Sequence, residues 1–522
     1  METPLSPLEL MRRTRRHYPE REAVVDGDVR FTYAQLFARC DRWAAALQAL
    51  GVQKGDRVAY IAPNMHAQLE SFHSVPQLGA VLVPINYRLI ADDFAYIIAH
   101  SGAKVVCAHP DYIAMVDSIR SQIPAVTTFV ALEGAKEGWI DYEATLAKAP
   151  RHFEKPEIAE TDLLTINYTS GTTARPKGVM ITHRNAYMNA IGTLVHVHMA
   201  AAKERYLWTL PMFHANGWTF TWIITAVGGT HVCLRKVEPP RIFAEMIKER
   251  ITMLCAAPTV LIGIASAPAE LRTGARKGVR VLTAGAPPAA ATIARVEGEL
   301  GWEILHVYGL TETSPFITLC EPRPEHEALS ADERATIKAR QGIELLTSGE
   351  LRVVDEEGRE VPHDGQTVGE IVVRGNAVMK GYFDDPAATE TALRGGYFHS
   401  GDAAVVHPDG FAEVRDRIKD VIISGGENIS SVEVEGVLLQ HPAVQEVAVV
   451  GMPDPKWGEA PHAFVILRGE TTAEILREFV RARLAHFKCP QAFHFVTELP
   501  KTATGKVQKF LLRGKKAGIT AQ

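Results

Sequence analysis

"NYTSGTTARPKG", residues 167–178, is the most informative short segment of this sequence. It follows an apolar run and places hydroxyl groups, two glycines and a lysine in one short loop. Hydroxyls, freed backbone N–H groups and a lysine cation together can cradle a polyphosphate. The loop lacks the GxxxxGK[ST] pattern of a P-loop, and taken alone it is also typical of a surface turn. The groups concerned belong to Thr169, Ser170, Gly171, Thr172, Thr173, Lys177 and Gly178.

Four further short stretches with glycine, hydroxyl and charged residues follow along the chain: "YGLTETSP" (308–315), "YFHSGD" (397–402), "DRIKDVIISGGENIS" (416–430) and "LPKTATGK" (499–506). Together with the first stretch, and in this order, they resemble the adenylate-forming superfamily of acyl-CoA synthetases, luciferases and peptide-synthetase adenylation domains. The resemblance covers nearly the whole chain. It implies that a carboxylate attacks the α-phosphorus of ATP, that pyrophosphate leaves, and that a thiol captures the acyl-adenylate.

The bulk composition is that of a globular protein of several domains, with 522 residues, 46% hydrophobic and 22% charged. A net charge of -5 gives no global electrostatic argument for binding nucleic acid or an anionic membrane. The six cysteines share no spacing, so neither a zinc site nor a disulfide framework is indicated.

Targeting signals are not evident, and we expect a cytoplasmic protein. "RRTRR" (12–16) is not followed by the apolar segment of a secretory signal, and the final "TAQ" is not a peroxisomal address. The apolar stretch "WTFTWIITAVGG" (218–229) is shorter than the roughly 20 residues that span a bilayer, so it predicts a buried helix.

The pattern of elements predicts an α/β fold. Short β-branched runs such as "RVAYIAP" (57–63) and "VRVLTAG" (279–285) alternate with longer helical stretches. Brief strands separated by turns predict a small β-rich subdomain at about 345–416. We therefore expect a large N-terminal domain of layered α/β sheets over 1–418, followed by a small α+β domain over 419–522.

The smaller domain has its own helix signals. Ser430 and Glu433 form a capping-box pattern before a helix over 432–440. "TAEILREFVRARLAHF" (472–487) places an apolar stripe on one face of a second helix, made of Ile475, Leu476, Phe479, Val480 and Leu484.

The resemblance implies a set of ATP-binding residues. Tyr308 matches the ring that stacks on adenine, Asp402 accepts the ribose hydroxyls, and Arg417 donates to the ribose. The implied set is Thr169, Ser170, Gly171, Thr172, Thr173, Lys177, Gly285, Ala286, Pro287, Tyr308, Gly309, Thr311, Asp402, Arg417 and Lys506.

Catalysis of the first step must overcome repulsion between two anions. The resemblance assigns the stabilising charge to Lys506 and to Mg²⁺, with Glu312 and Thr172 as metal ligands and Thr311 touching the α-phosphate. Lys501 does not match the "TGK" spacing, and we expect it to be a solvated charge.

The second step needs a different arrangement, which the superfamily reaches by rotating the small domain. Lys419 falls at the hinge position, and Gly425 and Gly426 would let the arm of CoA pass close to the backbone. A plain turn remains an alternative for the two glycines, as does an ordinary surface charge for the lysine.

"LPMFHANGW" (210–218) resembles the segment beside the acyl pocket. His214 takes the position that gates the thiol tunnel, whereas Phe213 and Trp218 contact the acid or belong to the core. One departure lies in the phosphate loop, where Ala174 replaces a glycine common in the superfamily.

The predicted function is an ATP- and Mg²⁺-dependent acid–thiol ligase that makes an acyl-CoA from a short- or medium-chain aliphatic acid. An aryl or long-chain acid, a separate carrier protein as acceptor, oxidation of the adenylate, and a catalytically inactive nucleotide-binding regulator stay open as alternatives. The predicted partners are the acid, ATP and CoA, without nucleic acid or integral membrane association, and a homodimer is left open.

Overall fold

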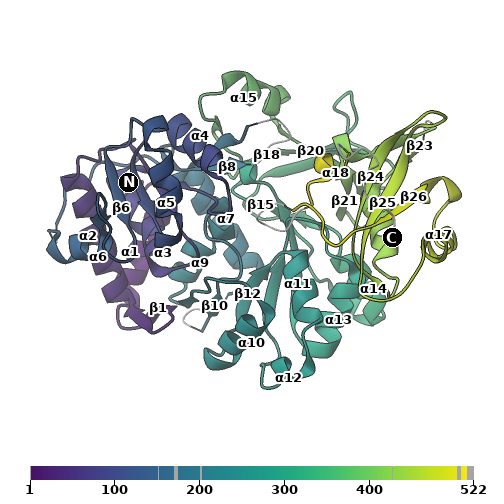
Figure 1. Cartoon of the computed structure of the whole chain (residues 1–522), viewed down its shortest axis with the longest axis horizontal. Helices are drawn as coiled ribbons and strands as arrows, with labels where there is room; N and C mark the ends of the chain where they lie inside the picture. Colours follow the sequence, from purple (N-terminus) through teal and green to yellow (C-terminus); the bar gives the residue numbers. More distant parts are fainter. Residues whose placement is uncertain are drawn as a thin grey trace.

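The structure is a computed structural model that describes residues 2–150, 152–169, 175–199, 203–425, 427–501 and 507–513. Two large sheets, each with a parallel central part, form the N-terminal part of the chain (Figure 1). The first sheet has the order β16 (Ile343–Glu344), β15 (Phe316–Leu319), β14 (Glu303–Gly309), β13 (Arg280–Thr283), β12 (Met253–Ala256), β10 (Arg205–Leu207), β11 (Thr230–Val232), β1 (Glu22–Asp26) and β2 (Val29–Thr32). The second has the order β19 (Gly381–Tyr382), β9 (Lys177–Thr182), β8 (Leu163–Thr169), β4 (Val81–Pro84), β3 (Arg57–Ile61), β5 (Ala103–Ala108), β6 (Thr128–Ala131) and β7 (Ile140–Asp141).

Side chains of successive strand residues enter different cores, as the period of two in a strand requires. In β3, Val58 and Tyr60 join the central core, whereas Ala59 and Ile61 face the outer core of the second sheet. A core between the two sheets and one on each outer face together give layered α/β sheets, and the predicted fold class is confirmed.

Helices fill these layers. The central core takes buried side chains from α1 (Pro7–His17), α2 (Tyr33–Ala49), α3 (His66–Ser74), α6 (Tyr142–Lys148), α7 (His183–His196) and α9 (Phe220–Ala226). The outer face of the second sheet is covered by α4 (Ala91–Ser101) and α5 (Pro110–Ser118). The outer face of the first is covered by α10 (Pro239–Lys248), α11 (Pro258–Ala265), α12 (Ala269–Arg272), α13 (Ala290–Leu300) and α14 (Ala331–Lys338).

The predicted buried helix within 218–229 is α9, and all its residues are buried. Among the described residues, no helix combines the length and apolar character needed to cross a bilayer. Short 3₁₀ turns connect several elements: η1 (Val75–Leu78), η2 (Arg120–Gln122), η3 (Thr311–Thr313), η4 (Pro324–Ala328), η5 (Arg394–Gly396), η6 (Ile418–Asp420) and η7 (His486–Lys488).

Two smaller sheets follow later in the chain. One is antiparallel, in the order β17 (Glu350–Val354), β18 (Gly369–Arg374), β20 (Phe398–Val406) and β21 (Ala412–Arg417), with α15 (Pro386–Ala392) beside β19. The other, in the C-terminal part, contains β23 (Glu427–Ile429), β22 (Ile422–Ser424), β25 (Gly458–Leu467), β24 (Val444–Asp454) and β26 (Ala492–Phe495). Its two faces are covered by α16 (Ser431–Leu438) with α17 (Ala473–Arg481), and by α18 (Lys509–Arg513).

Two local predictions for the C-terminal part need correction. Ser430 Oγ accepts a hydrogen bond from Glu433 N at 3.1 Å, so the N-cap exists, but the Glu433 carboxylate pairs with Lys488 instead of closing the box. In α17, Leu476 and Val480 are buried, whereas Ile475 lies at the edge of the stripe and is exposed.

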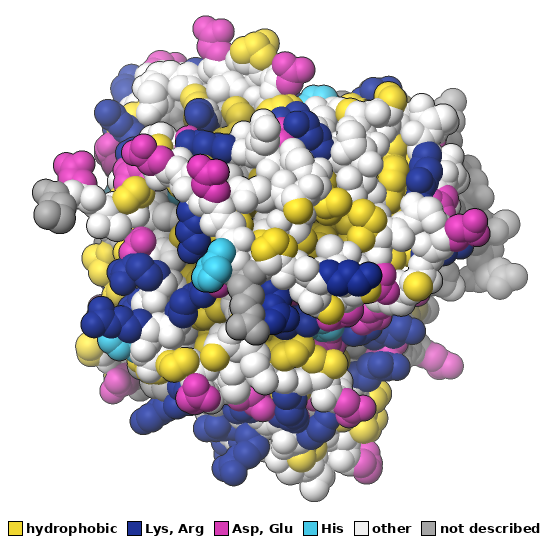
Figure 2. All heavy atoms as spheres, turned by 90° about the vertical axis from the view of Figure 1, so that its left-hand side faces the viewer, with side chains coloured by type: hydrophobic (Ala, Val, Ile, Leu, Met, Phe, Trp, Pro, Cys, Tyr) yellow, Lys and Arg dark blue, Asp and Glu magenta, His cyan; other side chains and the backbone are white. Residues whose placement is uncertain are grey.

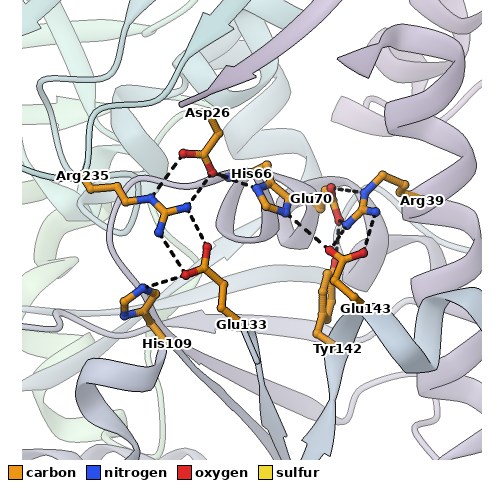
Figure 3. A network of polar contacts seen from close by, with 9 residues as sticks. All are labelled: Asp26, Arg39, His66, Glu70, His109, Glu133, Tyr142, Glu143 and Arg235. Atoms are coloured by element: carbon orange, nitrogen blue, oxygen red, sulfur yellow. Dashed lines mark hydrogen bonds and ion pairs between the residues drawn. The ribbon is translucent and has the colours of Figure 1, made fainter. Parts of the chain in front are cut away.

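A charged network joins the two large sheets where their parallel strands end (Figure 3). His66, at the start of α3, lies between the carboxylates of Asp26, at the end of β1, and Glu143 in α6. Burial opposes charge on this imidazole, but the two carboxylates outweigh burial and raise the pKa of His66 to about 9. The remaining members are Arg39, Glu70, His109, Glu133, Tyr142 and Arg235.

The surface of the N-terminal part is mixed in charge. Figure 2 shows a face on which basic and acidic side chains are interspersed, with hydrophobic side chains between them. A face of this kind offers no uniform positive field to a nucleic acid backbone.

Candidate active site

Three of the predicted ATP-binding residues converge from three strands. Tyr308 lies near the end of β14, and Asp402 and Arg417 face each other across β20 and β21. The Tyr308 hydroxyl donates to Asp402 Oδ2 at 2.6 Å, and Arg417 Nε lies 2.8 Å from Asp402 Oδ1. Each carboxylate oxygen has two lone pairs, so Asp402 keeps acceptor capacity for two ribose hydroxyls.

The environment of this cluster favours a charged Arg417 and a neutral Tyr308. Asp402 is 3% exposed. Burial, reinforced by the neighbouring carboxylate, raises the pKa of Tyr308. Burial opposes charge on Arg417, but Asp402 and the further groups Tyr308, Glu312 and Asp420 together outweigh it and raise the pKa of Arg417. Tyr308 therefore stays a hydrogen-bond donor to Asp402 at neutral pH.

The strand ends of the first large sheet place other predicted residues at the same edge. β13 and β14 are parallel neighbours, so Gly285, Ala286 and Pro287, which follow β13, lie at the edge of the sheet where β14 ends just after Tyr308. In open α/β sheets, ligands bind outside the carboxyl ends of the strands. Gly285 has φ +92°, a value suited to glycine.

Gly309 is required by packing. A Cβ atom at this position would lie 1.8 Å from the carbonyl oxygen of Pro315. No side chain fits there, so the chain can fold back after the 3₁₀ turn η3 only with glycine at this position.

The phosphate loop connects two antiparallel strands. Thr169 ends β8, Lys177 begins β9, and these two residues are register partners. A P-loop instead joins a strand to a helix, so the hairpin supports the exclusion of a P-loop NTPase. Ser170, Gly171, Thr172 and Thr173, and the departure at Ala174, lie outside the described residues.

Glu312 is held by a residue that the sequence did not reveal. The Tyr382 hydroxyl donates to Glu312 Oε1 at 2.9 Å, and Lys177 Nζ lies 4.7 Å from the centre of the Tyr382 ring. Thr311 precedes Glu312 in η3 and is buried. Tyr382 thus joins the Lys177 end of the phosphate loop to the predicted metal carboxylate.

Tyr382 comes from β19, which pairs with β9 far from it in sequence. Burial, reinforced by the Glu312 carboxylate, raises the pKa of Tyr382, so the hydroxyl stays protonated and donating. Its local sequence "KGYFDD" (380–385) contains no signal beyond an aromatic residue in a short polar stretch.

The segment predicted to line the acyl pocket is irregular. Phe213 packs edge-on against Tyr87, with ring centres 5.6 Å apart, and Trp218 packs edge-on against Phe316 at 5.4 Å. Both Phe213 and Trp218 are buried, so the structure is compatible with a pocket wall and with core packing. Desolvation of the half-buried His214 lowers its pKa to about 4, so the ring is neutral at pH 7.

Buried asparagines hold the irregular segments around this site, and sequence reasoning missed them. Asn189 in α7 donates to the carbonyl oxygens of Thr313 and Phe316, and Asn185 donates to those of Asn376 and Val378. Asparagine is mostly found at protein surfaces, so the sequence alone gives no reason to expect these side chains to be buried. The full set is Asn64, Asn167, Asn185, Asn189 and Asn216.

The residues predicted for the second step are only partly described. Lys419 is exposed in η6, between the antiparallel β17–β21 sheet and the C-terminal sheet. Gly425 has φ +59°, and a Cβ there would lie 2.8 Å from the Trp457 ring. Gly426 and Lys506 lie outside the described residues. Lys501 forms an ion pair with Glu446 and does not approach Asp402 or Glu312 in any described contact.

Comparison with known proteins defines the class. A family profile described as AMP-binding enzyme matches residues 11–383, and one described as AMP-binding enzyme C-terminal domain matches residues 433–506. A 4-hydroxybutyrate–CoA ligase of Metallosphaera sedula is 43% identical over 98% of this chain and 94% of its own. A peroxisomal butyrate–CoA ligase of Arabidopsis thaliana is 39% identical over 98% and 93%.

The structural match agrees. The crystal structure of an anthranilate CoA ligase in complex with anthranoyl-AMP superposes with a TM-score of 0.88 at 25% identity, covering 98% of each chain. The fold is that of an AMP-binding CoA ligase. The chain belongs to the AMP-binding enzyme family, the adenylate-forming superfamily, in its acyl-CoA synthetase branch. The superfamily and the ligase class predicted from the motifs are confirmed.

Proposed function

We propose that this protein activates a short- or medium-chain aliphatic carboxylic acid with ATP and transfers the acyl group to CoA. The observation that carries the proposal is the contact between Tyr308, Asp402 and Arg417. Tyr308 and Arg417 hold the Asp402 carboxylate in place, and the aromatic ring of Tyr308 lies beside it, as a site for adenosine requires. The relatives named for butyrate and 4-hydroxybutyrate support a short aliphatic acid.

In the first half-reaction, a carboxylate oxygen of the acid attacks the α-phosphorus of ATP. A new O–P bond forms, the bond to pyrophosphate breaks, and acyl-AMP and pyrophosphate result. Both reactants are anions, so fixed cations and donors lower the barrier most. We assign this work to Lys177 and the hydroxyls of the phosphate loop, to Thr311, and to Lys506.

The residues present fit Mg²⁺. Carboxylate and hydroxyl oxygens are the hard ligands that this ion takes, together with phosphate oxygens and water. Glu312 and Thr172 would hold it, and it would neutralise charge on the phosphate oxygens. The hydrogen bond from Tyr382 fixes the orientation of the Glu312 carboxylate.

In the second half-reaction, the CoA thiol attacks the acyl carbon. A C–S bond forms, the bond from the acyl carbon to the phosphate oxygen breaks, AMP leaves, and the thiol proton is released to water. We infer that the C-terminal part turns about Lys419, which removes Lys506 and brings Gly425 and Gly426 to the site. A neutral His214 places no fixed charge on the path of CoA beside the acyl segment. The small-domain boundary at 418/419 belongs to this proposal.

We also place the protein in the cytoplasm. All six cysteines are free in the structure, which suits a reducing compartment. The Arabidopsis relative is named as peroxisomal, so a relative of similar length works in a different compartment.

The test is product analysis with a panel of carboxylic acids, MgATP and CoA. We expect an acyl-CoA and AMP from at least one short or medium aliphatic acid. Acid-dependent pyrophosphate exchange without acyl-CoA would favour a carrier protein or adenylate oxidation, and preference for benzoate or a long-chain acid would overturn the substrate class. Absence of exchange with every acid would indicate an inactive nucleotide-binding regulator.

A further inference from the structure

The irregular segment 208–219 ends in an unusual left-handed turn. It joins β10 to α9, and five consecutive residues have positive φ: Ala215 (35°), Asn216 (53°), Gly217 (59°), Trp218 (52°) and Thr219 (67°). L-residues seldom adopt this region, and a β-branched residue there is a genuine outlier. Such a turn persists only where its surroundings hold it.

A closed ring of three buried side chains supplies that hold. Asn167 Nδ2 donates to Asn216 Oδ1 at 3.2 Å, and Asn216 Nδ2 donates to Thr165 Oγ1 at 2.9 Å. The Thr165 hydroxyl closes the ring by donating to Asn167 Oδ1 at 2.7 Å. The second proton of Asn167 Nδ2 goes to the carbonyl oxygen of Phe213 at 3.2 Å. Thr165, Asn167 and Asn216 are 0%, 3% and 1% exposed, so water does not substitute for these bonds.

The two sides of the ring differ in how firmly the backbone is held. Thr165 and Asn167 belong to β8, which pairs with β9 along its length and with β4 on its other edge. Asn216 belongs to the turn, which has no strand partner. The strand therefore fixes the turn, and loss of the ring should free the turn and leave the strand in place.

The ring of hydrogen bonds connects two parts of the proposed active site. Beyond Asn167, β8 continues to its last residue, Thr169, after which the phosphate loop follows. The turn carries Trp218, which packs on Phe316, and follows Phe213, which packs on Tyr87. The start of the same segment is fixed by Asn64, whose Nδ2 donates to the carbonyl oxygens of Trp208 and Leu210 at 2.8 and 2.9 Å.

We propose that Thr165, Asn167 and Asn216 are positioning residues that fix the acid-binding turn relative to the strand that carries the phosphate loop. The ring sets where the Phe213 and Trp218 rings stand, and through them how large an acid fits beside the α-phosphate. This proposal rests on the proposed function, because it takes Phe213 and Trp218 as walls of the acid pocket.

The test uses Thr165→Val, which keeps the shape of the side chain and removes its hydroxyl. The variant leaves Asn167 Oδ1 and Asn216 Nδ2 unpaired, so we expect the KM for the acid to rise about tenfold while the KM for ATP stays within about twofold. The preference between the best acid and its homologue one methylene longer should fall about threefold. Acid-dependent pyrophosphate exchange provides these values.

Two matched variants separate the ring from general effects. Thr165→Ser keeps the hydroxyl and should retain the wild-type acid KM. Thr14→Val removes another buried hydroxyl, which donates from α1 to the carbonyl oxygen of Thr225 at 2.7 Å. Thr225 lies near the end of α9 that is farther along the chain from the turn, so both KM values should stay unchanged. A proportional rise of both KM values in Thr165→Val would overturn the proposal.

Hydrogen exchange gives a readout that does not need a substrate. In Thr165→Val, we expect faster amide exchange over 213–220 and unchanged exchange over β8. Unchanged exchange over 213–220 would overturn the proposal even if the activity fell. If the wild type adenylates no acid, the proposed function is wrong. Hydrogen exchange then still tests whether the ring of hydrogen bonds holds the turn in place. Asn216→Gly, which suits a positive φ, tests the same ring if Thr165→Val does not fold.

Discussion

Arg417 faces Asp402 across two adjacent antiparallel strands, and its Nε lies 2.8 Å from Asp402 Oδ1. The strand register and not a flexible loop sets this distance, so the pair stands in place before any nucleotide binds. Preorganised charge of this kind costs little reorganisation when a ligand arrives. If the pair holds the ribose as we propose, we expect it to affect ATP affinity more than the rate of the chemical step.

Asp402→Asn tests this role. The amide keeps the size of the side chain but loses the charge that Arg417 and the ribose hydroxyls use, so the KM for ATP should rise about 100-fold. Acid-dependent pyrophosphate exchange at varied ATP measures the change. Glu357→Gln, in an exposed turn of the same antiparallel sheet, should leave the KM unchanged. A wild-type KM in Asp402→Asn would remove Asp402 from the nucleotide site.

Tyr382→Phe tests the hydrogen bond to Glu312. Loss of a hydrogen bond to a charged group costs about 1.5–3 kcal/mol, so the adenylation rate should fall about tenfold or more. Because the carboxylate loses its fixed orientation, the Mg²⁺ concentration for half-maximal rate should also rise. The rate of pyrophosphate exchange at varied Mg²⁺ measures both effects.

Tyr397→Phe is the matched control for this experiment. Its hydroxyl also donates to a glutamate, Glu350 Oε2 at 2.7 Å, on an exposed part of the molecule. We expect this variant to behave like the wild type. If the two variants lost activity equally, the Tyr382 contact would have no special role.

The sequence predicted the fold where a local pattern determines the local structure. The runs 57–63 and 279–285 contain β3 and β13, because a buried parallel strand needs a short apolar run and little else. Ile475 was misassigned because it lies at the margin of the helical stripe, where small rotations of the helix decide exposure. The Glu433 side chain was misassigned because Lys488 competes for it from another segment.

The site was predictable only as far as its motifs extend. Tyr308, Asp402 and Arg417 lie in quoted motifs, and the structure brings them together. Tyr382 could not be found, because its contact with Glu312 depends on the pairing of β19 with β9. The dipeptide Asn216–Gly217 does indicate positive φ, but nothing local extends that conformation to Trp218.

Lys506→Ala should separate the two half-reactions. Removal of a charge that stabilises the first transition state should lower acid-dependent pyrophosphate exchange by about 10²- to 10³-fold. The variant should still convert supplied acyl-AMP and CoA into thioester, because we propose that the lysine leaves the site in the second arrangement. Equal loss of both steps would contradict the division of labour.

Gly426→Leu is predicted to have the opposite effect. A bulky side chain should obstruct the path of CoA, so thioester formation from supplied acyl-AMP should fall at least about tenfold while pyrophosphate exchange stays near the wild-type rate. Quantifying acyl-AMP and acyl-CoA separately distinguishes the two steps. Loss of pyrophosphate exchange alone would place this glycine in the adenylation arrangement.

The His66 network should make stability depend on pH in a defined direction. The pKa of His66 is raised from 6.5 to about 9, so its stabilising contribution is complete below about pH 6.5 and disappears as the pH rises through 9. Burial opposes charge on Asp26, but hydrogen bonds from His66 and Arg235 outweigh it and lower its pKa from 3.8 to about 2. The Asp26 contribution is thus lost only as the pH falls from about 3.8 towards 2.

His66→Gln should therefore lower the free energy of unfolding at about pH 6 by roughly 3 kcal/mol, and by much less at about pH 10, because the wild type has lost the same interaction there. Urea unfolding of both proteins at the two pH values measures the difference. Thr14→Val serves as the control, since a threonine hydroxyl does not titrate between these pH values, and it should change the free energy of unfolding equally at both. A His66→Gln difference that stays constant or grows between pH 6 and pH 10 would show that the imidazole is not held as a cation between Asp26 and Glu143.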